Sequence, residues 1–178
     1  MLFITDVIAL AAVFLAVSTT ASPIQQLHQR AGAPIPKSIP SSCTVTNPIA
    51  SLAFVSYSST PAARYRPTNA TKTSQLYAYY LDPSSFQVTS SNSTSVFAQC
   101  LQTCYGYGNT GECVAAYMAY DVPTPPMFGA PGGNPSVACL MYSRMLGGGD
   151  FEAVPEGTAG WANATAGDIL CPPSPQRA

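Results

Sequence analysis

Residues 96–122 read VFAQCLQTCYGYGNTGECVAAYMAYDV, and this stretch decides which fold the chain can form. Apolar side chains recur every four positions in two rows: Val96, Cys100, Cys104 and Phe97, Leu101, Tyr105. That spacing places both rows on one face of a helix. Thr94 or Ser95 is the expected N-cap, and Gly106 is the expected stop. The glycine-rich residues 105–111 then predict a tight connection to a strand over residues 113–122.

Strand character appears in four other segments. They are residues 52–57, 75–81 (QLYAYYL), 137–146 (VACLMYSRML) and 150–154, the last as a short edge strand. Turn-forming residues fill the stretch from 58 to 73, and a loop of Pro, Gly and Asn covers residues 123–135. At 178 residues we expect one folded domain.

The six cysteines are expected to form three disulfides. Cys100 and Cys104 lie one helical turn apart, with Cβ atoms about 5–6 Å apart, whereas a disulfide needs about 3.5–4.5 Å. They should therefore bond to neighbouring elements rather than to each other. Short turns and strand positions favour the pairs Cys104–Cys113, Cys100–Cys139 and Cys43–Cys171. The last pair closes the longest loop and should stabilise the fold by about 4 kcal/mol in the chain-entropy model.

The chain combines a Cys-x3-Cys helix, a glycine-rich turn, a Cys-x-Ala-x-Tyr strand and a Cys-x-x-Tyr strand. This combination resembles the PAN/apple superfamily, and most closely the PAN-like small secreted proteins of fungi. The residues that carry the resemblance are Cys100, Cys104, Cys113, Ala115, Tyr117, Cys139 and Tyr142, bracketed by Cys43 and Cys171. The nested cysteine pairs are similar to the six-cysteine apple arrangement. The resemblance covers residues 93–146, and the stretch between Cys43 and Cys100 is longer than in a minimal apple module.

The resemblance implies an α+β fold in which a single helix packs on a curved antiparallel sheet stapled by disulfides. It also implies a protein that binds carbohydrate or another protein, without catalysis, a cofactor or a bound metal.

The N-terminus predicts export. Residues 7–17 (VIALAAVFLAV) are apolar but too few to span a bilayer, which takes roughly 20 residues. Small side chains at Thr19 and Ala21 favour a signal peptide over residues 1–21, cleaved near Ala21 or, as the weaker alternative, near Ser18, although no Lys or Arg precedes the apolar run. A buried N-terminal helix is the alternative. Residues 22–42 are expected to be a disordered leader, 43–171 the folded domain and 172–178 a disordered tail with no signal for a lipid anchor. We expect the product to be secreted and extracellular, either free or associated with a cell wall.

Three tripeptides fit the N-glycosylation pattern in turn-like polar segments. They begin at Asn69, Asn92 and Asn163. Only 8% of the residues are charged, so attached sugar would add to solubility, and we expect at least one of the three to be occupied.

Charge and residue types exclude several functions. The formal net charge is -1 and no basic cluster exists, which argues against a nucleic-acid partner. The single histidine, His28, lies in the leader, so no Ser-His-Asp or Cys-His site can form within the domain, and a zinc site is not expected. Paired acids, as in a small glycoside hydrolase, remain open through Asp150 and Glu152, which would share a strand face. Two solvated acids on an edge strand are the simpler interpretation.

Aromatic side chains are the candidate ligand contacts. Tyr105 and Tyr107 flank Gly106 on the glycine-rich turn, and Trp161 is the single tryptophan. Core packing competes with this role for Tyr105, and a glycan on Asn163 would hinder Trp161. The remaining aromatic residues of the strands are expected to pack the sheet core: Tyr77, Tyr79, Tyr80, Tyr117 and Tyr120. The expected function is a secreted, non-catalytic binding module for carbohydrate or protein. The alternatives are a secreted interaction or effector-type protein, a structural protein, and the small glycoside hydrolase.

Overall fold

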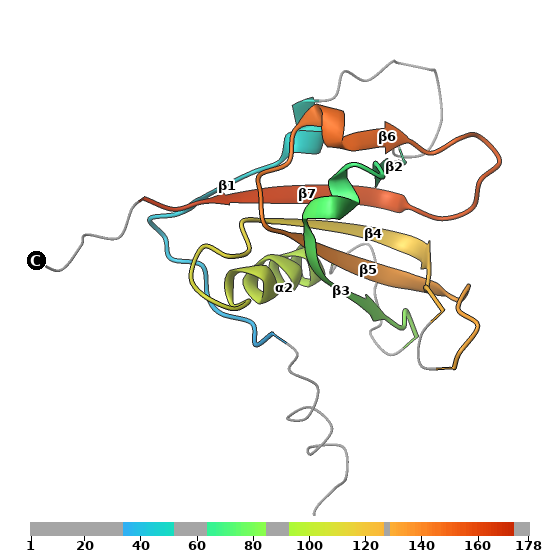
Figure 1. Ribbon diagram of the computed structural model, residues 1–178, viewed down its shortest axis with the longest axis horizontal. Coiled ribbons are helices and arrows are strands. Elements are labelled where there is room, and N and C mark those ends of the chain that lie inside the picture. Colours follow the sequence, from blue (N-terminus) through green and yellow to red (C-terminus); the bar gives the residue numbers. More distant parts are fainter. Residues whose placement is uncertain (1–33, 52–63, 85–92, 127–128, 173–178) are drawn as a thin grey trace, which may run out of the picture. The chain divides into compact units, whose positions relative to one another are not determined.

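One helix across an antiparallel sheet forms the centre of the fold, which confirms the expected α+β class (Figure 1). The computed structural model describes residues 34–51, 64–84, 93–126 and 129–172. The sheet has the strand order β1-β7-β4-β5-β3, and every neighbouring pair is antiparallel. Its strands are β1 (Thr44–Thr46), β3 (Gln75–Leu81), β4 (Ala115–Pro123), β5 (Pro135–Tyr142) and β7 (Ala162–Leu170).

Smaller elements complete the described residues. A two-stranded sheet pairs β2 (Tyr65–Pro67) with β6 (Phe151–Ala153). Short 3-10 helices are η1 (Pro48–Ser51), η2 (Thr71–Ser74) and η3 (Gly148–Asp150). The helix, α2 (Ser93–Tyr105), packs against β4, β5 and β7.

The central strands β4 and β5 are buried on both faces of the sheet. Because side chains alternate along a strand, neighbours on β4 enter different cores. Met118 joins the helix-side core with Cys100, whereas Tyr117 enters the core on the opposite side. There the Tyr117 hydroxyl donates a hydrogen bond to the Tyr65 carbonyl (2.5 Å), and its ring stacks on Phe151 at 5.8 Å. This second core joins the main sheet to β2 and β6.

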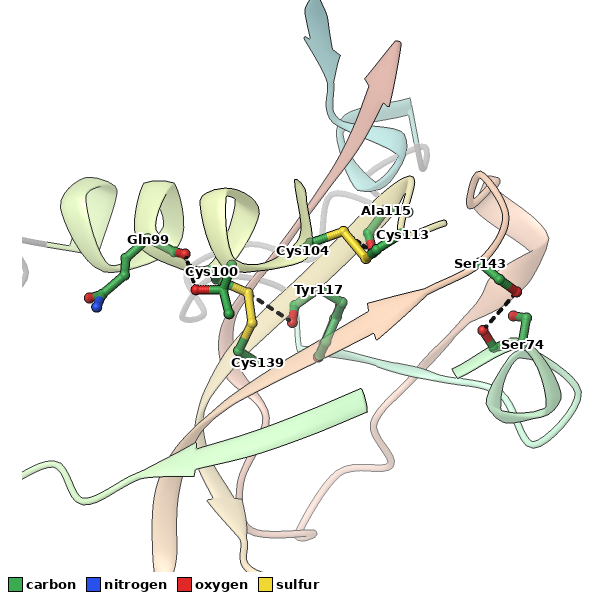
Figure 2. Close-up of a disulfide and its surroundings, with 10 residues drawn as sticks. Ser74, Gln99, Cys100, Cys104, Cys113, Ala115, Tyr117, Cys139 and Ser143 are labelled. Carbon is green, nitrogen blue, oxygen red and sulfur yellow. Dashed lines mark hydrogen bonds between the residues drawn. A yellow bond between two sulfur atoms is a disulfide. The ribbon is translucent and has the colours of Figure 1, made fainter. Parts of the chain in front are cut away.

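The structure contains the same three disulfides that the helix geometry predicts: Cys43–Cys171, Cys100–Cys139 and Cys104–Cys113. Figure 2 shows Cys100 and Cys104 reaching from the helix to different partners. Cys139 lies within β5, so its bond ties the helix to the middle of the sheet. All four cysteines of these two bonds are buried.

The sequence pattern did not predict strand β7, and it did not predict β1 or β2. The β7 sequence ANATAGDIL is rich in Ala, Asn, Gly and Asp, which strands normally contain least. Small side chains suit this position because the helix lies close above it. A Cβ built on Gly167 would lie 2.9 Å from Leu101 Cδ2 and 3.2 Å from Phe97 Cζ. Tertiary packing therefore selects residues that local propensity disfavours.

Several expected boundaries are wrong by a few residues. The helix begins at Ser93, so Thr94 and Ser95 lie in its first turn and neither is the N-cap. The strand expected over residues 137–146 ends at Tyr142. Asp150 ends a 3-10 helix, and only residues 151–153 form a strand, which pairs with β2 outside the main sheet. The strand expected over residues 52–57 lies outside the described residues.

The described segment before Cys43 contacts the helix. It starts at Pro34, and the Lys37 N–H donates to the Gln102 carbonyl (2.9 Å) near the end of the helix. Ile39 packs on the helix-side core. The Gln102 carbonyl also accepts from the Gly106 N–H (3.0 Å), so Lys37 is a second donor to a carbonyl at the end of the helix. Residues 1–33, with the predicted signal peptide, and residues 173–178 lie outside the described residues.

Candidate functional site

The three aromatic residues proposed as ligand contacts do not form one site. Tyr105 and Tyr107 are half-buried against the helix-side core, whereas Trp161 packs on the opposite core. The Trp161 ring lies 6.2 Å from that of Tyr117, and the Tyr107 ring lies 6.0 Å from that of Tyr77. Core packing therefore occupies much of each side chain.

The turn around Tyr105 is also covered by the N-terminal segment. The Lys37 Nζ lies 5.6 Å from the centre of the Tyr105 ring. A Cβ on Gly106 would lie 2.0 Å from the Ile35 carbonyl oxygen, so glycine is required here by close approach of another chain segment. This contact, rather than exposure of the turn, explains the glycine.

A groove runs along β3, and described residues form both of its walls. Two cavities, of about 530 Å³ and 390 Å³, share Tyr80, Thr124 and Asn134 and together form what we call the β3 groove. One wall is residues 77–84, which are β3 and the turn that follows it. The other wall comes from the connection between β4 and β5 and from the first two residues of β5: Thr124, Pro125, Ala130, Pro131, Gly132, Asn134, Pro135 and Ser136. Binding sites for ligands commonly have volumes of about 300–1,000 Å³.

The position of β3 in the sheet makes this groove possible. β3 is an edge strand that pairs with β5 alone among the described strands, and all seven of its residues are partly exposed. The β4–β5 connection lies beyond one end of β3 (Figure 1). The groove therefore combines two segments that are far apart in the sequence.

The wall formed by the β4–β5 connection is braced by its own hydrogen bonds. The Thr124 N–H donates to the Asn134 carbonyl (2.9 Å), and the Gly133 N–H donates to the Thr124 carbonyl (2.7 Å). The Asn134 N–H also donates to Thr124 Oγ1 (3.2 Å). These bonds leave the Asn134 side chain exposed at the boundary between the two cavities.

Charge in the groove is confined to one acid. Among the described lining residues Asp82 is the one charged side chain, and none is Lys, Arg or His. The Ser84 hydroxyl (2.7 Å) and N–H (2.8 Å) donate to Asp82 Oδ1 and lower the pKa of this carboxyl, so it is ionised at neutral pH. Burial raises the pKa of Tyr79 and of Tyr80, so both phenols stay neutral there.

Sequence reasoning missed this groove because it assigned the tyrosines of β3 to the core. One local signal pointed to it: an aromatic strand ends at the turn Asp82-Pro83-Ser84, which is typical of an exposed loop. The second wall, contributed by residues 124–125 and 130–136, could not be found without the tertiary structure.

A smaller cavity of about 220 Å³ lies at the other end of the sheet. It is lined mainly by apolar residues, including Val114, Met145 and Leu170, and by the exposed Cys171. Its volume is below that of most ligand sites.

The acids proposed for catalysis belong to separate ion pairs. Glu152 Oε1 accepts from Arg66 Nε (2.7 Å), whereas Asp150 pairs with Arg144. The Arg144 guanidinium, with hydrogen bonds from the Gly147 N–H and Thr71 hydroxyl, lowers the pKa of Asp150 to about 2. Asp150 is therefore ionised at neutral pH and cannot donate a proton as a general acid.

Asp168 is a buried neighbour of this ion pair that the sequence did not single out. Its Oδ1 accepts a hydrogen bond from the Leu146 N–H (2.9 Å), and burial raises its pKa. The bond ties β7 to the segment that follows β5. Among the described residues, no group of three or more His, Cys, Asp or Glu side chains could hold a metal ion. No helix in the described ranges has the length and apolar character to cross a membrane.

Two of the three predicted glycosylation sites fall within the described residues. Asn69 is exposed in the turn before η2, where its Oδ1 accepts from Lys72 Nζ (3.1 Å). Asn163 is exposed but lies in β7 with a φ of 48°, so its segment is a strand rather than the expected turn. Asn92 lies outside the described residues.

Comparisons with known proteins find no matching family model, no matching curated protein and no matching solved structure. The resemblance to the PAN/apple superfamily therefore stays a prediction from the cysteine, alanine and tyrosine pattern.

Proposed function

We propose that this protein is a secreted, non-catalytic binding module that takes an extracellular carbohydrate or protein in the β3 groove. The observation that carries the proposal is the groove itself: an open site with a braced wall, neutral hydroxyl and amide groups and a single acid. Such a surface offers hydrogen bonds and apolar contact, which are what recognition of an uncharged ligand requires.

Secretion is supported by the cysteine chemistry. Three disulfides in a chain of this size are typical of proteins that fold in an oxidising compartment. The apolar run over residues 7–17 and the three glycosylation tripeptides agree with that route. Expression of residues 1–178 in eukaryotic secretory cells should place the protein in the medium with Ser22 as its first residue. Treatment with an N-glycosidase should then lower its mass.

The small glycoside hydrolase is the weaker alternative. A retaining or inverting pair needs one carboxyl that is protonated at the working pH. Asp150 is held ionised by Arg144, and Glu152 is engaged by Arg66. A secreted effector-type or structural protein would use the same groove and differ in the identity of its ligand.

The test is retention of the purified, glycosylated protein on insoluble chitin, cellulose and β-glucan, and on arrays of extracellular proteins. We expect retention on one ligand, displaced by its soluble form. Asn134→Arg would fill the groove from its shared wall and should weaken binding at least about tenfold, which is the equivalent of about 1.4 kcal/mol. Gln99→Arg is the matched control, because it adds the same charge at an exposed position of the helix.

Equal loss of binding in both variants would point to a general charge effect and contradict a site in the groove. Absence of binding to every polysaccharide and every extracellular protein would contradict the binding function itself.

A further inference from the structure

The β3 groove exposes the edge of a strand rather than one of its faces. Successive side chains of a strand point to opposite faces of the sheet. A cavity over one face would therefore contact every second residue. The groove is lined by every residue from 77 to 84, which places its floor along the backbone edge of β3.

The pairing of β3 with β5 shifts register between Gln75 and Tyr77, and beyond this point the edge of β3 carries neither charge nor proline to prevent pairing with another chain. Natural edge strands are commonly short, charged or interrupted by proline. β3 has seven residues, QLYAYYL, with no charge and no proline. At the opposite edge of the same sheet, β1 has only three residues. Of these two edges, β3 alone is long enough to pair with several residues of a ligand.

The tyrosines of β3 do not form a flat aromatic platform of the kind on which sugar rings stack. Tyr79 packs toward the helix-side core and Tyr80 toward the opposite core. Tyr77 is engaged by the ring of Tyr107 at 6.0 Å. Alternation separates Tyr80 from Tyr77 and Tyr79, and the rings of Tyr77 and Tyr107 are tilted by 39°, whereas the N–H and C=O groups of the edge remain in one line. This arrangement favours a peptide over a polysaccharide.

We infer that the β3 groove binds an extended segment of a partner protein, which adds to the sheet as a strand beside β3. This inference rests on the proposed binding function and names the ligand class. The partner strand lies between the β3 edge and the braced wall at Thr124 and Asn134, and backbone hydrogen bonds supply most of its affinity. Ionised Asp82 at one end selects an uncharged or basic segment and disfavours an acidic one.

The test uses a library of short random peptides displayed on phage and selected on the folded, disulfide-intact protein. A selected peptide is then synthesised with an N-methyl group at each backbone position in turn. N-methylation removes one hydrogen-bond donor and leaves the side chain in place. In a strand, alternate N–H groups face the neighbouring strand, so alternate positions should lose about tenfold or more in affinity, measured by calorimetry. The positions between them should lose much less.

Protein variants locate the bound peptide. Asn134→Arg should weaken binding at least about tenfold, and Gln99→Arg should leave it unchanged. Asp82→Asn should weaken the binding of peptides with a basic residue at one end and leave the binding of uncharged peptides unchanged. Amide hydrogen exchange of β3 should slow at alternate residues when peptide is bound.

Four outcomes would overturn the inference. In the first, no selected peptide depends on Asn134 for its binding, and in the second, N-methylation weakens binding equally at every position. In the third, sedimentation shows that the protein associates with itself through β3 as its concentration rises. In the fourth, a polysaccharide occupies the groove and peptides do not. The last of these would leave the proposed binding function standing. Failure of both peptides and polysaccharides would remove the binding function as well.

Discussion

Two buried tyrosines on neighbouring strands differ in a single hydrogen bond. Tyr117 on β4 and Tyr142 on β5 are both 0% exposed, and burial raises the pKa of each phenol. The Tyr117 hydroxyl donates to the Tyr65 carbonyl, whereas the Tyr142 hydroxyl has no hydrogen-bond partner among the described residues. A buried hydroxyl without a partner lowers the stability of the folded state.

Removing each hydroxyl should therefore affect the free energy of unfolding differently. Tyr117→Phe leaves the Tyr65 carbonyl without its donor and should lower the free energy of unfolding by about 1–2 kcal/mol. Tyr142→Phe removes an unsatisfied group and should leave that free energy unchanged or raise it. Urea unfolding followed by fluorescence measures both. A larger loss for Tyr142→Phe than for Tyr117→Phe would contradict this account.

At Gly167 the helix side chains lie close against β7. Gly167→Ala places a methyl group 2.9 Å from Leu101 Cδ2 and 3.0 Å from Val45 Cγ1, so these side chains must shift. We expect the free energy of unfolding to fall by about 1–3 kcal/mol. Gly149→Ala is the control, because no heavy atom lies within 4 Å of the added carbon. Urea unfolding should show a clear difference between them, and equal effects would contradict close packing of the helix on β7.

At the scale of elements, the disulfides divide into two buried bonds and one accessible bond. Cys100–Cys139 and Cys104–Cys113 attach the helix to the sheet from inside the helix-side core. Cys43–Cys171 joins the ends of the paired strands β1 and β7, and Cys171 is exposed. The bond that closes the longest loop is therefore the one that solvent reaches.

Mild reduction without denaturant should open the disulfides in that order. A thiol reductant must reach a sulfur atom, so Cys43 and Cys171 should be alkylated first. The four buried cysteines should react only at reductant or urea concentrations that unfold the protein. Mass spectrometry of alkylated peptides gives the order. Early labelling of Cys104 or Cys113 would show that the helix end opens more easily than its burial predicts.

Across the whole molecule, the ion pair of Arg144 with Asp150 makes stability depend on acid pH. The pKa of Asp150 is about 2 in the folded state, below its ordinary value of 3.8. Its contribution is therefore complete above about pH 4 and is lost as the pH falls toward 2. Burial raises the pKa of Asp168 instead, so that acid stabilises the fold less as the pH rises above 3.8.

Asp150→Asn should flatten the acid part of the stability profile. The shift corresponds to at most about 2 kcal/mol at neutral pH, and solvent screening lowers this value because the Arg144 side chain of the pair is 46% exposed. Urea unfolding at several pH values between 2 and 7 should show a steep loss in the wild type below pH 4 and a smaller one in the variant. Glu156→Gln, at an exposed acid, should leave the profile unchanged within about 0.5 kcal/mol. Identical profiles for wild type and Asp150→Asn would contradict the lowered pKa.

The features that the sequence determined by itself are those with a local physical cause. Four-residue spacing predicted the helix to within three residues of its start, and the run QLYAYYL predicted β3. The fixed distance between Cys100 and Cys104 on a helix excluded a bond between them and led to the observed pairs.

Only the tertiary structure decided the remaining features, because their causes lie in contacts between distant segments. β7 forms a strand despite its small and polar residues, since it pairs with β4 and passes beneath Leu101. Trp161 belongs to the core because it packs against Tyr117. The β3 groove exists because the β4–β5 connection lies next to an edge strand that precedes it by some forty residues. No local sequence pattern indicates that the β4–β5 connection lies next to β3, so the candidate site follows from the fold and not from a motif.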